Sequence, residues 1–177
     1  LFNYHAILPI CETASVFCEM LVIDELKKRA TSPNELMILL TTKLEDVFAT
    51  SHRQNMFSRF EQEVHKKVMD GRVSGHELCE IYRNELTKMF GDSVEITDEY
   101  HWEWASIPHM LDVPFYVYSY NFGNLLVLGL YQIYLNEGES FIPKLKRILM
   151  AGSSKPPVQL LADEGIDILS ESFWQGS

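Results

Sequence analysis

Two glutamates, Glu12 and Glu19, stand seven residues apart near the start of the sequence, in a stretch of good helix formers. Seven residues are nearly two turns of α-helix, so both carboxylates point to the same side of a helix. Small or apolar residues such as Ala14 and Val16 flank Glu12, which predicts that its carboxylate avoids open water. A carboxylate away from water needs a cationic partner or a metal ion. The residues alone leave open a plainer alternative, a solvated helix face or pairing with Lys or Arg.

A second group of residues with chemical potential consists of His109 and the phenols of Tyr116, Tyr118 and Tyr120. In a helix opened by Pro114, Tyr116 and Tyr120 share a face and Tyr118 points roughly the opposite way. Buried phenols need hydrogen-bond partners, so three of them within two turns are unusual. The proline before His109 is expected to hold it in a non-helical loop over the start of this helix. An aromatic core helix with a surface histidine is the alternative.

The elements that must position these residues are all helical, so the predicted fold class is all-α. Ser32 and Ser74 are each followed three residues later by a glutamate, a pattern that predicts capped helix starts. Gly91 is a predicted helix stop. Residues 91–113 are irregular and are expected to form a loop with one short extended piece. The expected helices cover residues 9–30, 33–71 (one helix, or two with a break near residues 50–51), 75–90, 114–138, 141–152, 156–165 and 168–174.

Length and charge restrict the class of protein. A chain of 177 residues with 46% hydrophobic content buries one sizeable core, so we expect residues 1–177 to be one domain or part of one. The net charge of −10 argues against binding to nucleic acid or to an anionic membrane. Residues 113–135 are long enough to span a membrane, but their many polar side chains favour a helix buried in a soluble bundle.

The cysteines and the N-terminus indicate a compartment. The three cysteines show no C-x-x-C spacing, and Cys11 and Cys18 fall on the apolar side of the first helix. We therefore expect reduced, buried thiols, which are typical of a cytoplasmic protein. Residues 1–30 lack the basic start and the small-residue cleavage site of a signal peptide.

Two motifs carry a resemblance to a known family. Glu12-Thr13-Ala14-Ser15, with Glu19 four residues further on, resembles the zinc-ligand helix of the oligoendopeptidase F and thimet oligopeptidase family. The resemblance implies that Glu12 is the third ligand of a catalytic zinc ion. It also implies that Glu19 sits behind the metal site and orients a metal-bound histidine.

The second motif is Trp104-Ala-x-Ile-Pro-His109 followed by Phe115-Tyr-x-Tyr-x-Tyr120, which resembles the substrate-binding segment of oligoendopeptidase F. It implies that His109 and the hydroxyls of Tyr116, Tyr118 or Tyr120 face the zinc and stabilise the oxyanion of the tetrahedral intermediate. Residues 121–124 depart from the usual small-residue run, which reshapes the pocket. Weaker similarity at residues 53–65 and 160–167 extends the resemblance over nearly the whole chain, and all of it implies a zinc metalloendopeptidase of short peptides.

The chain lacks the His-Glu-x-x-His pair with which the family binds zinc and activates water. We therefore expect the chain to be the C-terminal piece of a longer peptidase, inactive by itself, with an oligopeptide as substrate. Its expected partners are the missing N-terminal part of the same protein and, through apolar surface left exposed, a second copy. The alternative is a non-catalytic helical interaction module or a metal-free degenerate relative, which the sequence upstream of Leu1 would reveal.

Overall fold

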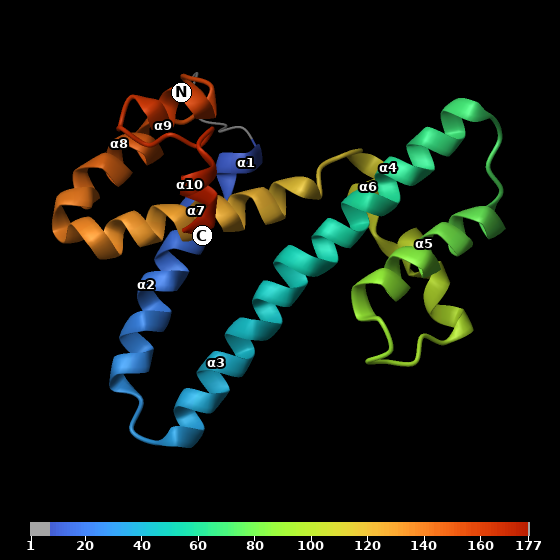
Figure 1. Cartoon of the computed structure of the whole chain (residues 1–177), viewed down its shortest axis with the longest axis horizontal. Coiled ribbons are helices and arrows are strands. Elements are labelled where there is room, and N and C mark those ends of the chain that lie inside the picture. The colour runs from blue at the N-terminus through green and yellow to red at the C-terminus, as the bar shows by residue number, and fades with distance from the viewer. Residues whose placement is uncertain (1–7, 177) are drawn as a thin grey trace. The chain divides into compact units, whose positions relative to one another are not determined.

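The computed structural model describes residues 8–176, and these form helices and turns without a β-strand, which confirms the all-α prediction (Figure 1). Residues 1–7, on which the expected absence of a signal peptide partly depends, lie outside the described range. The elements are α1 (Leu8–Cys11), α2 (Thr13–Arg29), α3 (Pro33–Val47), the π-helical segment η1 (Phe48–Arg53), α4 (Gln54–Asp70), α5 (Gly75–Phe90), the 3₁₀ segment η2 (Asp98–Ser106), α6 (Pro108–Asp112), α7 (Tyr118–Glu137), the 3₁₀ segment η3 (Gly138–Phe141), α8 (Ile142–Ala151), α9 (Pro157–Ala162) and α10 (Glu171–Gln175).

Local sequence explains several helix boundaries. At the start of α5, the Ser74 hydroxyl accepts the Glu77 amide and the Glu77 carboxylate accepts the Ser74 amide, so the predicted capping box is present. Gly91 ends α5 with a φ of 59°, a conformation that favours glycine. The predicted break near residues 50–51 is instead the π-helical segment η1, which widens the turn between α3 and α4 without ending the helical run.

The described chain divides into two compact units. The first contains the residues up to Leu44 and those from Phe122 onward, and its core forms where α2, α7, α8 and α9 bury their apolar faces. Phe17 of α2 is 1% exposed, and its ring meets the rings of Tyr131 and Phe141 at centroid distances of 5.6 and 6.2 Å. Aromatic contacts of this kind fix how α2 is rotated about its own axis.

The second unit, Glu45–Asn121, contains η1, α4, α5, η2 and α6. Phe60 of α4 packs edge-on against the fully buried Tyr82 of α5, with ring centroids 5.1 Å apart. The Tyr82 hydroxyl donates to Glu103, which also pairs with Arg53, so the 3₁₀ segment η2 is tied to α5 and to the end of η1. Burial and the neighbouring carboxylate raise the pKa of Tyr82, so this phenol remains a neutral donor.

Three sequence-based expectations about local structure are wrong. Residues 91–113 contain two helical pieces, η2 and α6, because packing of Trp104 and Met110 against the α4–α5 core folds this segment. The helix expected from Pro114 begins at Tyr118, because Phe115 adopts a left-handed φ of 61° that no helix accommodates. Cys18 and Cys11 are exposed rather than buried: α2 turns Thr13 and Phe17 to the core instead of Cys18, and Cys11 is the last residue of the separate short helix α1.

Among residues 8–176, no helix combines the length and the apolar character needed to cross a membrane. The 20-residue helix α7 instead buries Leu126, Val127 and Leu130 in the core of the first unit.

Candidate functional site

The structure brings His109, Tyr116 and Tyr120 together within the second unit. The His109 ring lies 6.2 Å from the Tyr116 ring and 6.0 Å from the Tyr120 ring, measured between centroids. The two tyrosine rings lie 5.1 Å apart, and all three contacts are edge-to-face. Tyr118 is 49% exposed and has no ring contact with this group. We call His109, Tyr116 and Tyr120 the His–Tyr cluster.

Two helices and the turn between them position the members of the His–Tyr cluster. His109 lies in the one-turn helix α6, which begins at Pro108, so the expected non-helical loop is wrong. Proline suits the first position of a helix because its missing N–H has no partner there in any case. Tyr116 lies in the turn before α7, and Tyr120 lies in the first turn of α7. The Ser119 amide donates to the Tyr116 carbonyl at 3.0 Å, a tight turn that keeps both tyrosine rings on one side.

His109 is half-buried, and its Nε2 atom is enclosed without a hydrogen-bond partner among the described residues. A buried ring nitrogen of this kind normally has a partner, so Nε2 is available to a group that enters the cluster. An imidazole nitrogen donates or accepts according to its protonation, and a phenol hydroxyl does both. The His–Tyr cluster therefore places one enclosed ring nitrogen and two phenol rings within 6.2 Å of one another, measured between ring centroids.

Glu61 of α4 is a buried carboxylate beside the cluster; it lies within residues 53–65, which carry part of the weaker resemblance, but the sequence predicted no role for it. It is 3% exposed, and its Oε1 atom accepts the Phe115 amide at 2.9 Å. Its Oε2 atom is enclosed without a hydrogen-bond partner in the described part of the chain. Desolvation raises the pKa of Glu61, opposed by the Phe115 hydrogen bond and by the nearby His65 and His109. The i, i+4 spacing of Glu61 and His65 on one helix face was the signal that could have identified it.

A cavity of about 130 Å³ opens next to Glu61. Most of its wall is apolar, and it is enclosed by α4, α5, η2 and α6, the last of which also carries His109. The lining residues are Phe60, Glu61, Val64, His65, Leu78, Trp104, Met110 and Leu111.

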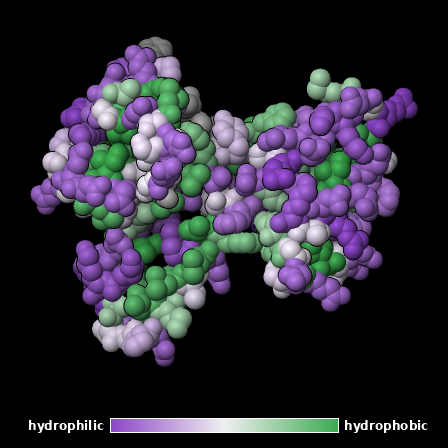
Figure 2. All heavy atoms as spheres, in the orientation of Figure 1, coloured by the Kyte–Doolittle hydropathy of each residue, from purple (hydrophilic) through white to green (hydrophobic). Residues whose placement is uncertain are grey.

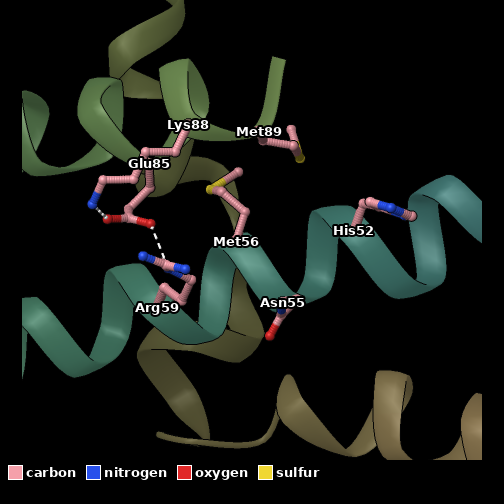
Figure 3. Close-up of a pocket in the computed structure, with 7 residues that line it drawn as sticks. All are labelled: His52, Asn55, Met56, Arg59, Glu85, Lys88 and Met89. Atoms are coloured by element: carbon pink, nitrogen blue, oxygen red, sulfur yellow. Dashed lines mark hydrogen bonds and ion pairs between the residues drawn. The ribbon is translucent and has the colours of Figure 1, made fainter. Parts of the chain in front are cut away.

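A second hollow, of about 210 Å³, lies between η1–α4 and α5 and is polar (Figure 3). One of its lining residues is Glu85, which is 3% exposed and accepts hydrogen bonds from Arg59 at 2.9 Å and from Lys88. Figure 3 shows the Glu85 carboxylate held between these two cations. A buried carboxylate needs such partners, so these charges serve mainly to neutralise one another.

Glu12 and Glu19 lie in the first unit and are exposed, so the prediction that Glu12 avoids solvent is wrong for this chain. The reason is the rotation of α2, which buries Thr13 and Phe17 and leaves the side with the glutamates outward. Glu12 stands at the junction of α1 and α2, where its Oε2 atom accepts the Ser15 hydroxyl at 2.9 Å. Glu19 pairs with Lys43 of α3 at 2.6 Å.

Within the described residues, no group of three His, Cys, Asp or Glu side chains could hold a metal ion. Glu12 nevertheless fits the role of a single ligand in a shared site. Its carboxylate is oriented by the Ser15 hydroxyl and retains open coordination directions. A catalytic zinc ion takes three protein ligands, so two would have to come from elsewhere.

Comparison with known proteins gives consistent matches. Residues 3–177 match the profile of Peptidase family M3. The chain is 32% identical to Oligopeptidase PepF of Bacillus subtilis over 91% of its length, and 30% identical to an Oligoendopeptidase F homolog of Borreliella burgdorferi over 91%. The crystal structure of oligoendopeptidase-F from Enterococcus faecium superposes with a TM-score of 0.82 at 26% identity, covering 93% of this chain and 32% of that one. The chain spans 24% and 27% of the two sequence relatives, about a quarter of their length.

Proposed function

This chain belongs to peptidase family M3, and from that premise we propose that it forms the C-terminal part of the catalytic domain of a zinc metalloendopeptidase that hydrolyses short peptides. The observation that carries the proposal is the His–Tyr cluster, in which three polar aromatic side chains converge from separate elements. A family match alone would be compatible with a degenerate relative. Convergence of hydrogen-bond donors is what an active peptidase requires.

We assign the metal-binding role to Glu12. It would supply one carboxylate oxygen, and two histidines of the upstream region would complete the set of ligands. Glu19, which faces the same side of the helix as Glu12, would orient a metal-bound histidine of that region. Zinc, when bound, polarises a scissile carbonyl and activates a water molecule, and a glutamate of the upstream region would accept the proton.

The His–Tyr cluster would stabilise the oxyanion that forms when water adds to the scissile carbonyl. Hydrogen-bond donors fixed in advance stabilise developing charge without the reorganisation that water needs. His109 would donate from its ring, and Tyr116 and Tyr120 would donate from their hydroxyls. Tyr118 receives no such role in this proposal, because it is half-exposed and outside the cluster.

We also propose that the upstream part of the same protein covers an apolar surface on the hairpin of α2 and α3. No residue of α3 is buried. Its apolar side chains Met37, Ile38 and Leu44 are all exposed. Figure 2 shows this apolar surface in green, and a hollow of about 300 Å³ lies between the two helices. Exposed apolar area of this kind marks an interaction site. The chain spans about a quarter of the length of its relatives. The upstream part of the full-length protein would therefore be the segment that covers this surface, and a second copy of the chain is the alternative partner.

Two variants of the full-length protein test the proposal. Glu12→Gln weakens an anionic oxygen ligand, so zinc content and peptide hydrolysis should both fall. His109→Ala leaves the ligands intact, so zinc should stay bound while turnover slows. Zinc is measured by atomic emission and hydrolysis with a fluorogenic peptide. Full activity in both variants would show that the assigned roles are wrong, and an inactive wild-type protein that holds no zinc would favour the non-catalytic alternative.

A further inference from the structure

Phe115 has a backbone conformation that its side chain disfavours. Its φ of 61° makes it the one residue other than glycine with a positive φ in the described part of the chain. A Cβ atom crowds the carbonyl oxygen in this left-handed region, so such residues persist only where their surroundings hold them. The residue after Phe115 is Tyr116 of the His–Tyr cluster.

Two side chains of α4 hold Phe115 from both ends. The Glu61 carboxylate accepts the Phe115 amide at 2.9 Å, which fixes the backbone. The His65 ring lies 4.5 Å from the Phe115 ring and covers one side of it, while the Phe115 residue remains 44% exposed. Because Glu61 and His65 are four residues apart on one helix, α4 acts on Phe115 as a single rigid support.

A purely structural role explains the Glu61 carboxylate poorly. Burying this group costs desolvation, and one of its oxygens has no hydrogen-bond partner among the described residues. An apolar side chain of similar size would fill the same space without that cost. What the carboxylate adds is an acceptor for one amide, at the residue that sets the direction of Tyr116.

We propose that Glu61 is a positioning residue for the His–Tyr cluster. By accepting the Phe115 amide, it keeps the left-handed turn that directs the Tyr116 ring against His109 and Tyr120. The role proposed for Glu61 requires no contact with substrate, and it depends on the proposed function only for its effect on turnover. The backbone link between Glu61 and Phe115 is testable without any activity.

The experiment compares Glu61→Gln and Glu61→Leu in the full-length protein. Glutamine keeps an acceptor oxygen and leucine does not, so the pair isolates the hydrogen bond from the volume of the side chain. Glu85→Leu is the matched control, because Glu85 is equally buried in the same unit but pairs with Arg59 and Lys88. Hydrogen–deuterium exchange of the zinc-free protein reports on the Phe115 amide, and kcat and KM report on turnover.

In Glu61→Leu we expect kcat to fall roughly tenfold to a hundredfold with a small change in KM, as for other misplaced catalytic groups. The segment containing the Phe115 amide should exchange faster. Glu61→Gln should resemble the wild type in both measurements, and Glu85→Leu should change neither of them, whatever it does to the melting temperature. Equal kcat in Glu61→Leu and Glu85→Leu, or an equal loss in Glu61→Gln and Glu61→Leu, would overturn the inference.

If Glu61→Leu does not fold, the double variant Glu61→Leu/Phe115→Gly replaces it, since glycine adopts the left-handed conformation without support. If Glu61 acts by supporting the Phe115 backbone, the kcat of the double variant should lie within roughly threefold of the kcat of Phe115→Gly alone. A further loss in the double variant would refute the positioning role. If the wild-type protein hydrolyses no peptide, the proposed function fails, and the exchange measurement still decides whether Glu61 holds Phe115.

Discussion

Removing single tyrosine hydroxyls from the full-length protein distinguishes the tyrosines of the His–Tyr cluster from the one outside it. Tyr116→Phe and Tyr120→Phe each delete one oxygen and keep the ring. The ring of each variant can still make the edge-to-face contacts seen at 5.1, 6.0 and 6.2 Å. Packing is therefore preserved, and any change in turnover reports on the hydroxyl. Tyr118→Phe makes the same chemical change at a half-exposed position with no ring contact to the cluster.

The expected magnitude follows from the number of donors in the cluster. Losing one donor to an oxyanion costs on the order of 3 kcal/mol of transition-state stabilisation, or roughly a hundredfold in kcat. His109 and the remaining tyrosine would still donate in each single variant, so the double variant Tyr116→Phe/Tyr120→Phe should lose less than the product of the two single losses. KM should change little, because the hydroxyls act on charge that develops only in the transition state.

The assay is steady-state hydrolysis of a fluorogenic peptide by zinc-loaded protein, with zinc content and melting temperature measured for each variant. Tyr116→Phe and Tyr120→Phe should retain zinc and fold like the wild type. Tyr118→Phe should retain wild-type kcat within a factor of about two, as expected for an exposed substitution. If Tyr118→Phe lost as much activity as the others, or if all three retained it, the assignment of Tyr116 and Tyr120 to the oxyanion would be refuted.

Three further predictions concern the 177-residue chain itself. It should bind zinc weakly and hydrolyse no peptide, because one carboxylate cannot make a three-ligand site; tight stoichiometric zinc by titration calorimetry would contradict this. Phe17→Ala should lower the free energy of urea unfolding by about 3–5 kcal/mol, because a fully buried ring is removed, whereas Cys18→Ala on the exposed side of α2 should change it by less than about 0.5 kcal/mol. The two Ser74 hydrogen bonds and Lys67 lower the pKa of Glu77 from 4.5 to about 2. The capping box therefore stabilises the folded chain above pH 4.5, and this contribution is lost as the pH falls towards 2. Glu77→Gln should make the free energy of unfolding less dependent on pH in that range.

Local sequence predicts where most of the helices lie, but it does not predict which face of each helix is buried. Ser74 and Gly91 predict the two ends of α5 because a capping box and a left-handed glycine depend on neighbouring residues alone. The face of α2 that is buried depends on Tyr131 and Phe141, which are more than a hundred residues away in the sequence and receive the Phe17 ring. Periodicity along α2 carries no information about those partners, so the predicted burial of Glu12 failed.

The candidate site was predictable in part for the same reason. His109, Tyr116 and Tyr120 stand close in the sequence, so a short turn can bring them together, and the structure does so. Glu61 lies more than forty residues upstream of His109, in a helix where a glutamate normally faces solvent. Only the tertiary contact with the Phe115 amide shows what it does.

The lack of a buried residue in α3 has a consequence for biosynthesis. A ribosome makes the N-terminal part of a protein first, and domains fold in that order. If the upstream part covers α3, it has already been synthesised when Met37 and Ile38 emerge, so these side chains find their partner as the domain folds. Expressed without that part, the chain presents them to solvent throughout its lifetime, and precipitation during overproduction is the expected result.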